Sequence, residues 1–478
     1  MVDLQTVVGA LRLEDDGLPG VEVRASALPG LIDTLLSTLC GLANRPGGGL
    51  VLFGLDEALG YRAVELPDRR QTVADFAEAA RVALDPSIAI EVGEGTVDGT
   101  AIVALLVPEV DSASRPCRVV RGAQRGVWFH SLEGDYRATA AEARGARSSR
   151  AQPRFDADPA IGARRADLDR DLVSAFLRSC RERSPQLAQV HDDEELLWRT
   201  GVLVGPNRTP TIAGLLAMGT YPQQHLPGVC VQANADAPTS ERAPAAPRIQ
   251  SFDGPIGRMV ADAAGWVSRS VGATTAHGAS SSRGAQWPEI AVRAIVANAL
   301  LHRDLAPWAI SEAVSLRLDG DRLCVRNPGG LYGLSVDRLG RTGATPTRNA
   351  TLARICHYLQ PPDLSLTNEH AGSPGLPAAF AAMNSASLPA PVFDDDGLRF
   401  SVYLRRRSVH RVHVVRPGGS GAAVLAALSD GPAGVGQIVA QTHLTPANIR
   451  KRLRELRAVG LVLRHGGPGL PTTYERKR

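Results

Sequence analysis

The long amphipathic stretch near the C-terminus most constrains what this chain can fold into. From Pro446 to Gly460 the sequence reads PANIRKRLRELRAVG, in which apolar residues recur every three or four positions. These residues are Ile449, Leu453, Leu456 and Val459. Arginines and a lysine occupy most positions between them. A helix with one apolar stripe must bury it against other elements. The spacing therefore predicts a helix that closes a small domain and turns a basic face to solvent.

Two shorter helical runs precede this stretch, and a β-hairpin follows it. The runs are Ala422–Leu428 and Val435–Thr442, and Thr445 is placed to cap the long helix, with proline at its first turn. The hairpin pairs LVLRH with TTYERKR across the turn GGPGLP. The order helix, helix, basic helix, hairpin resembles the winged helix-turn-helix of bacterial regulators. The resemblance implies a DNA-binding domain over residues 419–478, joined to the rest by the short linker Arg416–Gly421.

Positive charge is concentrated in this segment. From Gly419 to the end the chain has nine basic and three acidic residues, a net of +6, whereas the whole chain carries +4 and the remainder therefore −2. Such asymmetry indicates a local contact with a polyanion. The candidate DNA-contacting residues are Asn448, Arg450, Lys451, Arg452, Arg454, Arg457 and, on the hairpin, Arg464. Polar residues early in the helix can reach base edges, and arginines can reach phosphates. The alternative is a solvated basic helix that contacts only proteins.

Composition excludes several classes of protein. The six cysteines include no C-x-x-C pair, which favours reduced thiols over a metal or disulfide framework. The first residues lack the charged and apolar regions of a signal peptide, and no stretch of about 20 apolar residues exists. No serine lies in a G-x-S-x-G motif. We therefore expect a cytoplasmic protein with double-stranded DNA as partner and no membrane contact.

The length of 478 residues requires several domains. Residues 1–145 predict an α/β domain, with a helix over 31–44 and buried strands over 50–55 and 101–107. Residues 160–275 predict a mainly helical connector. Residues 280–407 predict a helix over 289–301, a hairpin turning at Asp319-Gly320 and a closing strand over 398–405. With the C-terminal domain, the expected fold class is α+β multidomain.

Several polar motifs interrupt the third of these segments. Asn298 lies inside the nearly apolar helix PEIAVRAIVANALLHRD, where a buried amide requires a partner. His302 and Arg303 follow at the end of that helix. Further motifs are Asn327–Gly330, Thr347–Asn349 and Glu369–Gly375.

Taken in order, these motifs resemble the bacterial family of RecG-related transcriptional regulators. That family joins an AlbA-like, Schlafen-type N-terminal domain to a GHKL-type (histidine-kinase-like) ATP-binding domain and a C-terminal winged helix. The third segment matches through NALLHRD, RNPGGL and TRNATLA, and the connector matches through Pro210–Gly228. The first domain matches through Glu22–Arg24, Leu42–Asn44, Gly47-Gly48, Gly54–Asp56, Arg115-Pro116 and Val127–Ser131.

The resemblance implies ATP and Mg²⁺ as cofactors in the third segment. Asn298 would hold Mg²⁺ against the triphosphate, and His302 and Arg303 would lie near phosphates. Asn327 stands where GHKL proteins usually have an aspartate that binds the adenine amino group. The implied glycine positions are Gly329 and Gly330 beside the ring, and Gly372 and Gly375 in the phosphate lid.

Two departures from the family pattern argue against ATP hydrolysis. Ala294 stands where the family has a glutamate that activates the attacking water, and alanine cannot abstract a proton. Pro374 interrupts the glycine run of the lid. We therefore expect a nucleotide effector that binds without efficient hydrolysis, or a degenerate site. The alternative is a domain that serves only as scaffold or dimerisation unit, and a homodimer is expected in either case.

The first domain raises the hypothesis of an enzyme. Schlafen-type nucleases hold metal with three carboxylates; Glu22 and Asp56 match two positions, and Gly17 stands at the third. Gly47–Gly49 lacks the lysine of a P-loop. The leading hypothesis is therefore a non-catalytic DNA-binding transcriptional regulator. The alternatives are a nucleotide-dependent enzyme acting on nucleic acid, either ATPase or metal-dependent nuclease, and an adaptor that binds only proteins.

Overall fold

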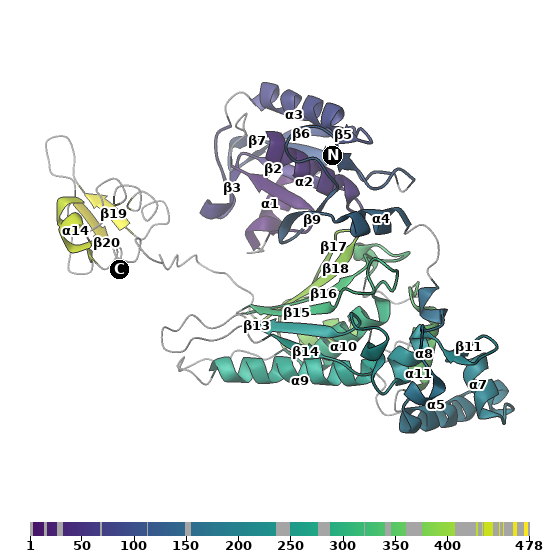
Figure 1. Ribbon diagram of the computed structural model, residues 1–478. Coiled ribbons are helices and arrows are strands. Elements are labelled where there is room, and N and C mark those ends of the chain that lie inside the picture. The colour runs from purple at the N-terminus through teal and green to yellow at the C-terminus, as the bar shows by residue number, and fades with distance from the viewer. Residues whose placement is uncertain are drawn as a thin grey trace.

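Figure 1 shows a computed structural model of the chain. The structure describes residues 3–13, 17–25, 32–66, 69–111, 113–148, 154–235, 249–275, 287–319, 321–339, 346–359, 375–406, 427–428, 433, 435–442, 449, 453, 462–465 and 473–476.

The N-terminal unit is built on a four-stranded sheet. Across the sheet the order is β1 (Val21–Arg24), β2 (Gly49–Phe53), β7 (Thr100–Val107) and β6 (Glu91–Val97). β1 and β2 run parallel, because the helix α2 (Ile32–Asn44) lies between them in the chain, and the other neighbours are antiparallel. These elements confirm the helix predicted over 31–44 and the strand predicted over 101–107.

Helices cover both faces of this sheet. Val51 joins a core with α2 and α3 (Arg69–Ala83), whereas Leu50 joins a second core with α1 (Leu4–Leu13). Successive side chains of a strand point to opposite faces, so a strand buried on both sides reads as a continuous apolar run. The run predicted over 50–55 ends sooner than expected, because Gly54 has a φ of +88° and breaks the strand.

Short elements complete this unit. β9 (Trp128–Ser131) and β10 (Gly134–Arg137) form a hairpin that is followed by α4 (Ala140–Ser148). In Figure 1, β9 and α4 lie on the side of the N-terminal unit that faces β17 (Val392–Asp395) and β18 (Arg399–Arg405). The remaining short strands are β3 (Leu55–Asp56), β4 (Arg62–Ala63), β5 (Leu84–Asp85) and β8 (Arg118–Val119).

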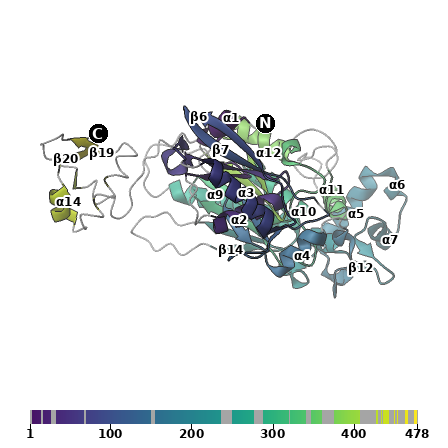
Figure 2. The ribbon, with the colours of Figure 1, turned by 90° about the horizontal axis from the view of Figure 1, so that it is seen from above.

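A group of helices forms the next part of the molecule. Four of them follow one another in the chain, α5 (Arg170–Arg183), α6 (Pro185–Ala188), α7 (Asp193–Arg199) and α8 (Ile212–Met218), and α11 (Ala350–Leu359) packs against α5 and α8 from later in the chain. Asp169, Asp192 and Thr211 cap α5, α7 and α8 by accepting backbone N–H groups. The small strands β11 (Leu203–Val204) and β12 (Thr209–Pro210) pair beside them. Figures 1 and 2 both show α5 and α7 at one end of the molecule.

The third unit is a six-stranded sheet with helices on one face. The strand order is β14 (Gln250–Phe252), β13 (Val231–Ala235), β15 (Val314–Asp319), β16 (Arg322–Pro328), β18 (Arg399–Arg405) and β17 (Val392–Asp395). The packed helices are α9 (Ile256–Thr275), α10 (Glu289–His302) and α12 (Leu376–Ser385). β15, β16, β18 and α10 confirm the predicted helix, hairpin and closing strand.

The expected boundary between connector and third segment does not hold. β13 pairs in parallel with β15, although β13, β14 and α9 all lie within residues 160–275. One continuous hydrophobic core also extends from Ala160 to Leu404. The sheet needs the strands from both segments to bury its apolar face, so the two predicted domains pack as one unit.

The C-terminal segment has its own small core. Buried in it are Leu428, Ala433, Ile438, Ile449 and Leu453. α14 (Val435–Thr442) confirms the second predicted helix, and β19 (Val462–His465) and β20 (Thr473–Arg476) pair as the predicted hairpin. Most of the two other predicted helices lies outside the described residues. None of the described helices combines the length and apolar character needed to cross a membrane.

Candidate functional site

Three sequence motifs far apart in the chain meet at the C-terminal end of α10. The Asn349 side chain donates from Nδ2 to the carbonyls of Leu301 and Arg303, at 2.9 and 2.8 Å. Arg348 lies 3.3 Å from the Asp304 carboxylate, and its Nη2 donates to the Gly330 carbonyl at 2.8 Å. The structure thus brings together NALLHRD, RNPGGL and TRNATLA, the three motifs that carry the resemblance in this segment.

The glycine turn after β16 is filled by the protein itself. Gly329 has a φ of +97°, and a Cβ there would lie 2.8 Å from Cβ of Asp304. A Cβ on Gly330 would lie 2.6 Å from Oδ1 of Asp395. Both positions thus require glycine, but the close neighbours are carboxylate side chains of the same chain. The structure therefore explains both glycines by packing within the chain.

Arg303 is a correction to the sequence analysis. Its side chain is fully buried, and Nη2 donates to the carbonyls of Ala309 and Glu312, at 2.9 and 2.7 Å. Burial lowers the pKa of Arg303 to about 10, so the guanidinium remains charged at neutral pH. It therefore fixes the loop after α10, where backbone carbonyls satisfy its donors, and does not face a phosphate.

His302 and Asn298 are the implied ligand-binding residues that stay partly accessible. Burial, with a smaller contribution from Arg348, lowers the pKa of His302 to about 4. A neutral imidazole at pH 7 adds no positive charge for a phosphate. Asn298 is half-buried on α10. Within the described part of the chain, its amide has no hydrogen-bond partner, so it alone fits the implied role of a ligand-facing residue.

The remaining implied nucleotide positions offer little. Asn327 is buried at the end of β16 and donates to the Pro328 carbonyl at 3.3 Å. Ala294 is fully buried in the core. Gly375 begins α12 with a φ of −55°, which any residue can adopt. Gly372 lies outside the described residues.

The N-terminal unit contacts the sheet directly beside this turn. Arg45 Nη1 lies 2.5 Å from Oδ1 of Asp394, and both side chains are buried. The other Asp394 oxygen accepts the backbone N–H of Leu132 at 2.8 Å. Tyr136 on β10 donates from its hydroxyl to Asp396 at 2.9 Å. Residues more than 250 positions apart thus form one buried polar interface.

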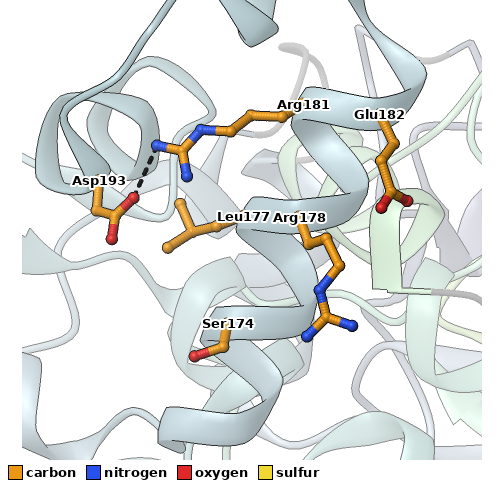
Figure 3. A pocket seen from close by; sticks show the side chains of 6 residues that line it. All are labelled: Ser174, Leu177, Arg178, Arg181, Glu182 and Asp193. Carbon is orange, nitrogen blue, oxygen red and sulfur yellow. Dashed lines mark hydrogen bonds and ion pairs between the residues drawn. The ribbon is translucent and has the colours of Figure 1, made fainter.

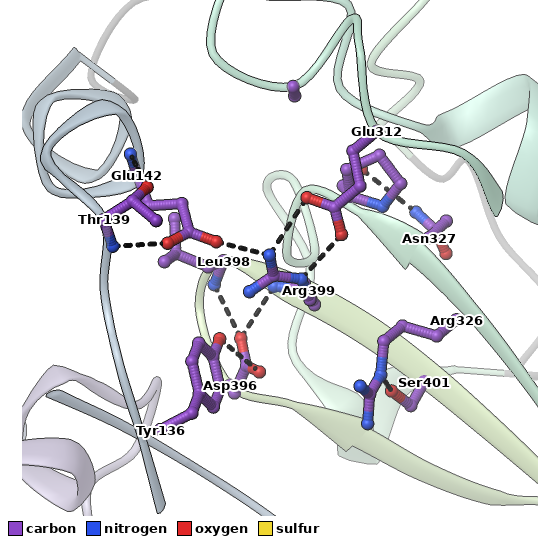
Figure 4. A network of polar contacts seen from close by, with 12 residues as sticks. Tyr136, Thr139, Glu142, Glu312, Arg326, Asn327, Asp396, Leu398, Arg399 and Ser401 are labelled. Atoms are coloured by element: carbon purple, nitrogen blue, oxygen red, sulfur yellow. Dashed lines mark hydrogen bonds and ion pairs between the residues drawn. The ribbon is translucent and has the colours of Figure 1, made fainter. Parts of the chain in front are cut away.

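Arg399 lies at the centre of this interface (Figure 4). Its guanidinium pairs with Glu142 of α4 and, at 2.7 Å, with Glu312. Burial raises the pKa of Asp396 to about 6, with a smaller contribution from the neighbouring Asp394. The sequence analysis missed these residues. The signal available was the acidic triplet Asp394–Asp396 between two apolar strands, where unpaired carboxylates are costly to bury.

The carboxylates expected for a nuclease do not assemble a metal site. Glu22 on β1 pairs with Arg24, and burial raises the pKa of this carboxyl group. Asp56 lies on β3, and Gly17 supplies no ligand. Among the described residues, no three His, Cys, Asp or Glu side chains come close enough to hold a metal ion.

A shallow surface pocket lies on α5, away from all the predicted site residues (Figure 3). In it, Arg181 pairs with Asp193 at 2.7 Å and also donates to the carbonyls of Val190 and His191. The lining residues are Ser174, Leu177, Arg178, Arg181, Glu182 and Asp193. The Arg181 charge is therefore used to join α5 to α7 and is not free for a ligand.

The predicted DNA-contacting residues fall on the C-terminal segment. Ile449 and Leu453 are helical and buried, as their spacing predicts. Arg464 lies on β19. The others, Asn448, Arg450, Lys451, Arg452, Arg454 and Arg457, lie outside the described residues.

Comparison with known proteins assigns two parts of the chain. Residues 312–404 match the family model described as "Putative ATP-dependent DNA helicase recG C-terminal". Residues 422–463 match the model of the bacterial regulatory proteins of the arsR family. A search of curated proteins found no match.

Two solved structures are among the similar ones. The DIP2311 protein of Corynebacterium diphtheriae is 17% identical with a TM-score of 0.36, over 96% of this chain and 80% of that one. The N-terminal domain of a putative ATP-dependent DNA helicase RecG-related protein of Nitrosomonas europaea is 25% identical with a TM-score of 0.22, over 26% of this chain and 88% of that one. By the two family models, residues 312–404 are similar to the RecG C-terminal family and residues 422–463 are similar to the arsR-family regulators.

Proposed function

We propose that this protein is a cytoplasmic DNA-binding transcriptional regulator whose RecG-type domain no longer hydrolyses ATP. The observation that carries the proposal is the match of residues 422–463 to a bacterial regulatory family. Three further features support it: the net charge of +6 after residue 418, the buried positions Ile449 and Leu453, and the paired strands β19 and β20. A winged domain of this kind places its basic helix in the major groove.

The sheet unit supports the non-catalytic half of the proposal. The general-base position is a buried alanine, Ala294, and the glycine turn is filled by Asp304 and Asp395. Arg303 is committed to backbone carbonyls, and His302 is uncharged. These residues do not fit a triphosphate with Mg²⁺, and we infer that this unit is a scaffold that positions the other domains.

The test is DNA binding by the full chain with Lys451→Ala and Arg452→Ala together. Removing one phosphate-binding side chain should reduce the slope of log affinity against log salt by about 0.9, so the double variant should show a slope smaller by about 2. Genome-wide recovery of bound DNA first identifies a duplex that the protein binds. Fluorescence anisotropy with that labelled duplex then measures the affinity and its slope against log salt.

A matched control removes the same charge elsewhere. Arg165 and Arg170 are exposed on the helical region, and their replacement by alanine should leave the slope unchanged. If the Lys451/Arg452 variant binds like this control, the assignment of the DNA-contacting helix is wrong. Light scattering of the same samples tests the proposed homodimer.

A further inference from the structure

The face of the six-stranded sheet opposite its helices carries three arginines on two neighbouring strands. Arg317 lies on β15, and Arg322 and Arg326 lie on β16. The residues that alternate with them belong to the core beneath the helices, namely Leu316, Leu318, Leu323 and Val325. Because successive side chains of a strand point to opposite faces, the three arginines lie on the other face. Figure 1 shows the N-terminal unit on that side of the sheet.

A single carboxylate of the N-terminal unit lies where these arginines meet. Oε1 of Glu133 lies 2.7 Å from Nη2 of Arg317 and 4.0 Å from Nη2 of Arg322. Its other oxygen lies 2.7 Å from Nη2 of Arg326. Three guanidinium groups are thus gathered around one carboxylate. Since like charges repel at this range, the arrangement depends on an anion between them. We call Arg317, Arg322 and Arg326 the arginine site.

Glu133 offers less than the arginine site can bind. Each guanidinium group has five N–H donors, whereas a carboxylate brings one negative charge and two oxygens. Arg326 also donates to the Ser401 hydroxyl at 3.1 Å, and Arg322 lies 3.9 Å from Asp319 (Figure 4). A phosphate group brings nearly two negative charges and three oxygens, and guanidinium groups bind it through paired, charge-assisted hydrogen bonds. The arginine site therefore suits a phosphate group better than a carboxylate.

The arginine site can be reached from solvent. The Arg317 side chain is 38% exposed and that of Glu133 is 22% exposed. On the same face of the sheet, Ser315 and Gln232 are exposed beside Arg317. A Cβ on Gly134 would meet nothing within 4 Å, so the hairpin turn that carries Glu133 is not packed tightly on that side. A small anion can thus approach without unfolding either unit.

We propose that the arginine site binds the phosphate group of a small soluble molecule, and that Glu133 occupies it as an internal competitor. Binding would displace Glu133 and loosen the β9–β10 hairpin, while Leu132 and Tyr136 keep their hydrogen bonds to the sheet unit. Arg322 and Arg326 are mostly buried, which admits a small anion more readily than a duplex. The proposal is independent of DNA binding by the C-terminal segment.

The experiment measures phosphate binding to the full chain by isothermal titration calorimetry at constant ionic strength. Glu133→Gln removes the competing charge but keeps one oxygen for the arginines, so the hairpin should remain docked. This variant should bind inorganic phosphate about tenfold or more tightly than the native chain. Adding Arg317→Gln and Arg322→Gln should abolish the gain, and Arg326 is retained because it also supports the sheet. Glycerol 3-phosphate, titrated in parallel, distinguishes a phosphate ester from free phosphate as the preferred source.

A matched control removes a glutamate charge from an exposed ion pair elsewhere. Glu78 pairs with Arg81 on α3, and Glu78→Gln should leave the phosphate affinity at its native value. Glu133→Asp provides a second variant at the site, because it draws the carboxylate back by one methylene and should give a smaller gain than Glu133→Gln. Thermal unfolding checks that each variant is folded, and Glu133→Asp decides the matter if Glu133→Gln is not.

Three outcomes would overturn the proposal. The first is equal phosphate affinity for the Glu133 variants and Glu78→Gln. The second is a gain that survives Arg317→Gln and Arg322→Gln, because the anion would then bind elsewhere. The third is tighter binding of a labelled DNA duplex by Glu133→Gln without any gain in phosphate affinity, because the partner would then be nucleic acid.

Discussion

Loss of the Arg45 charge should destabilise the interface between the N-terminal unit and the six-stranded sheet. The Arg45 and Asp394 side chains are only 7% and 1% exposed, and they lie 2.5 Å apart. Without Arg45, one Asp394 oxygen keeps the backbone N–H of Leu132, but the other loses its close partner. Removing one member of a buried pair typically costs about 3–5 kcal/mol, because the remaining charge is left uncompensated. We therefore expect Arg45→Met to lower the free energy of unfolding by about 3 kcal/mol or more.

A double-mutant cycle separates the pair from general packing. Asp394→Asn removes the charge but keeps an oxygen for Leu132, so Arg45→Met should cost much less in that background than in the native chain. The coupling free energy should be at least about 1.5 kcal/mol. Urea unfolding followed by circular dichroism measures all four proteins.

An exposed ion pair provides the control for this cycle. Arg81 and Glu78 are 66% and 59% exposed, and Arg81→Met should change stability by no more than about 0.5 kcal/mol. If Arg45→Met costs as little as Arg81→Met, then the interface does not depend on buried charge, and our reasoning about it is refuted.

Three further predictions concern the sheet unit and its neighbours. Gly329→Ala should lower the free energy of unfolding by more than about 2 kcal/mol, because Gly329 has a φ of +97° and an added Cβ would lie 2.8 Å from Asp304. Gly9→Ala, in an open helical position, should be neutral or stabilising by up to about 1 kcal/mol. Urea unfolding measures both variants, and a smaller loss for Gly329→Ala than for Gly9→Ala would contradict this prediction. Asp396 has a folded-state pKa raised to about 6, above its ordinary value of 3.8, so its ionisation should reduce stability as pH rises from about 4 to 6, by roughly 3 kcal/mol in total. Asp396→Asn should lack this loss, and parallel pH profiles of the two proteins would show that another group is responsible. Millimolar ATP with Mg²⁺ should leave the melting temperatures of the native chain and of Asn298→Ala unchanged, and no phosphate should be released from ATP. A rise in the melting temperature of the native chain that Asn298→Ala abolishes would show that the nucleotide site is functional.

Local sequence patterns predicted most individual elements. The apolar run of β2, the Asp-Gly turn between β15 and β16, and the helix spacing of Ile449 and Leu453 each depend on neighbouring residues only. Such signals follow from the periodicity of helices and strands and need no knowledge of distant contacts.

The roles of those polar residues required the tertiary structure. Whether Arg303 faces a ligand or the carbonyls of its own loop depends on where the chain folds after α10, and periodicity carries no such information. The same holds for Gly329 and Gly330, whose close neighbours are Asp304 and Asp395. A motif records the residue types that a site needs, but burial and partners decide whether the site is still open.

The sequence by itself determined most element types, the basic C-terminal segment and the alanine at position 294. Only the tertiary structure decided that the connector supplies β13 and β14 to the sheet, and that Arg45 meets Asp394 across 349 positions. The physical reason is that strand pairing and buried ion pairs are non-local. Their free energy comes from groups brought together by folding, and nothing in the neighbouring sequence specifies the partner.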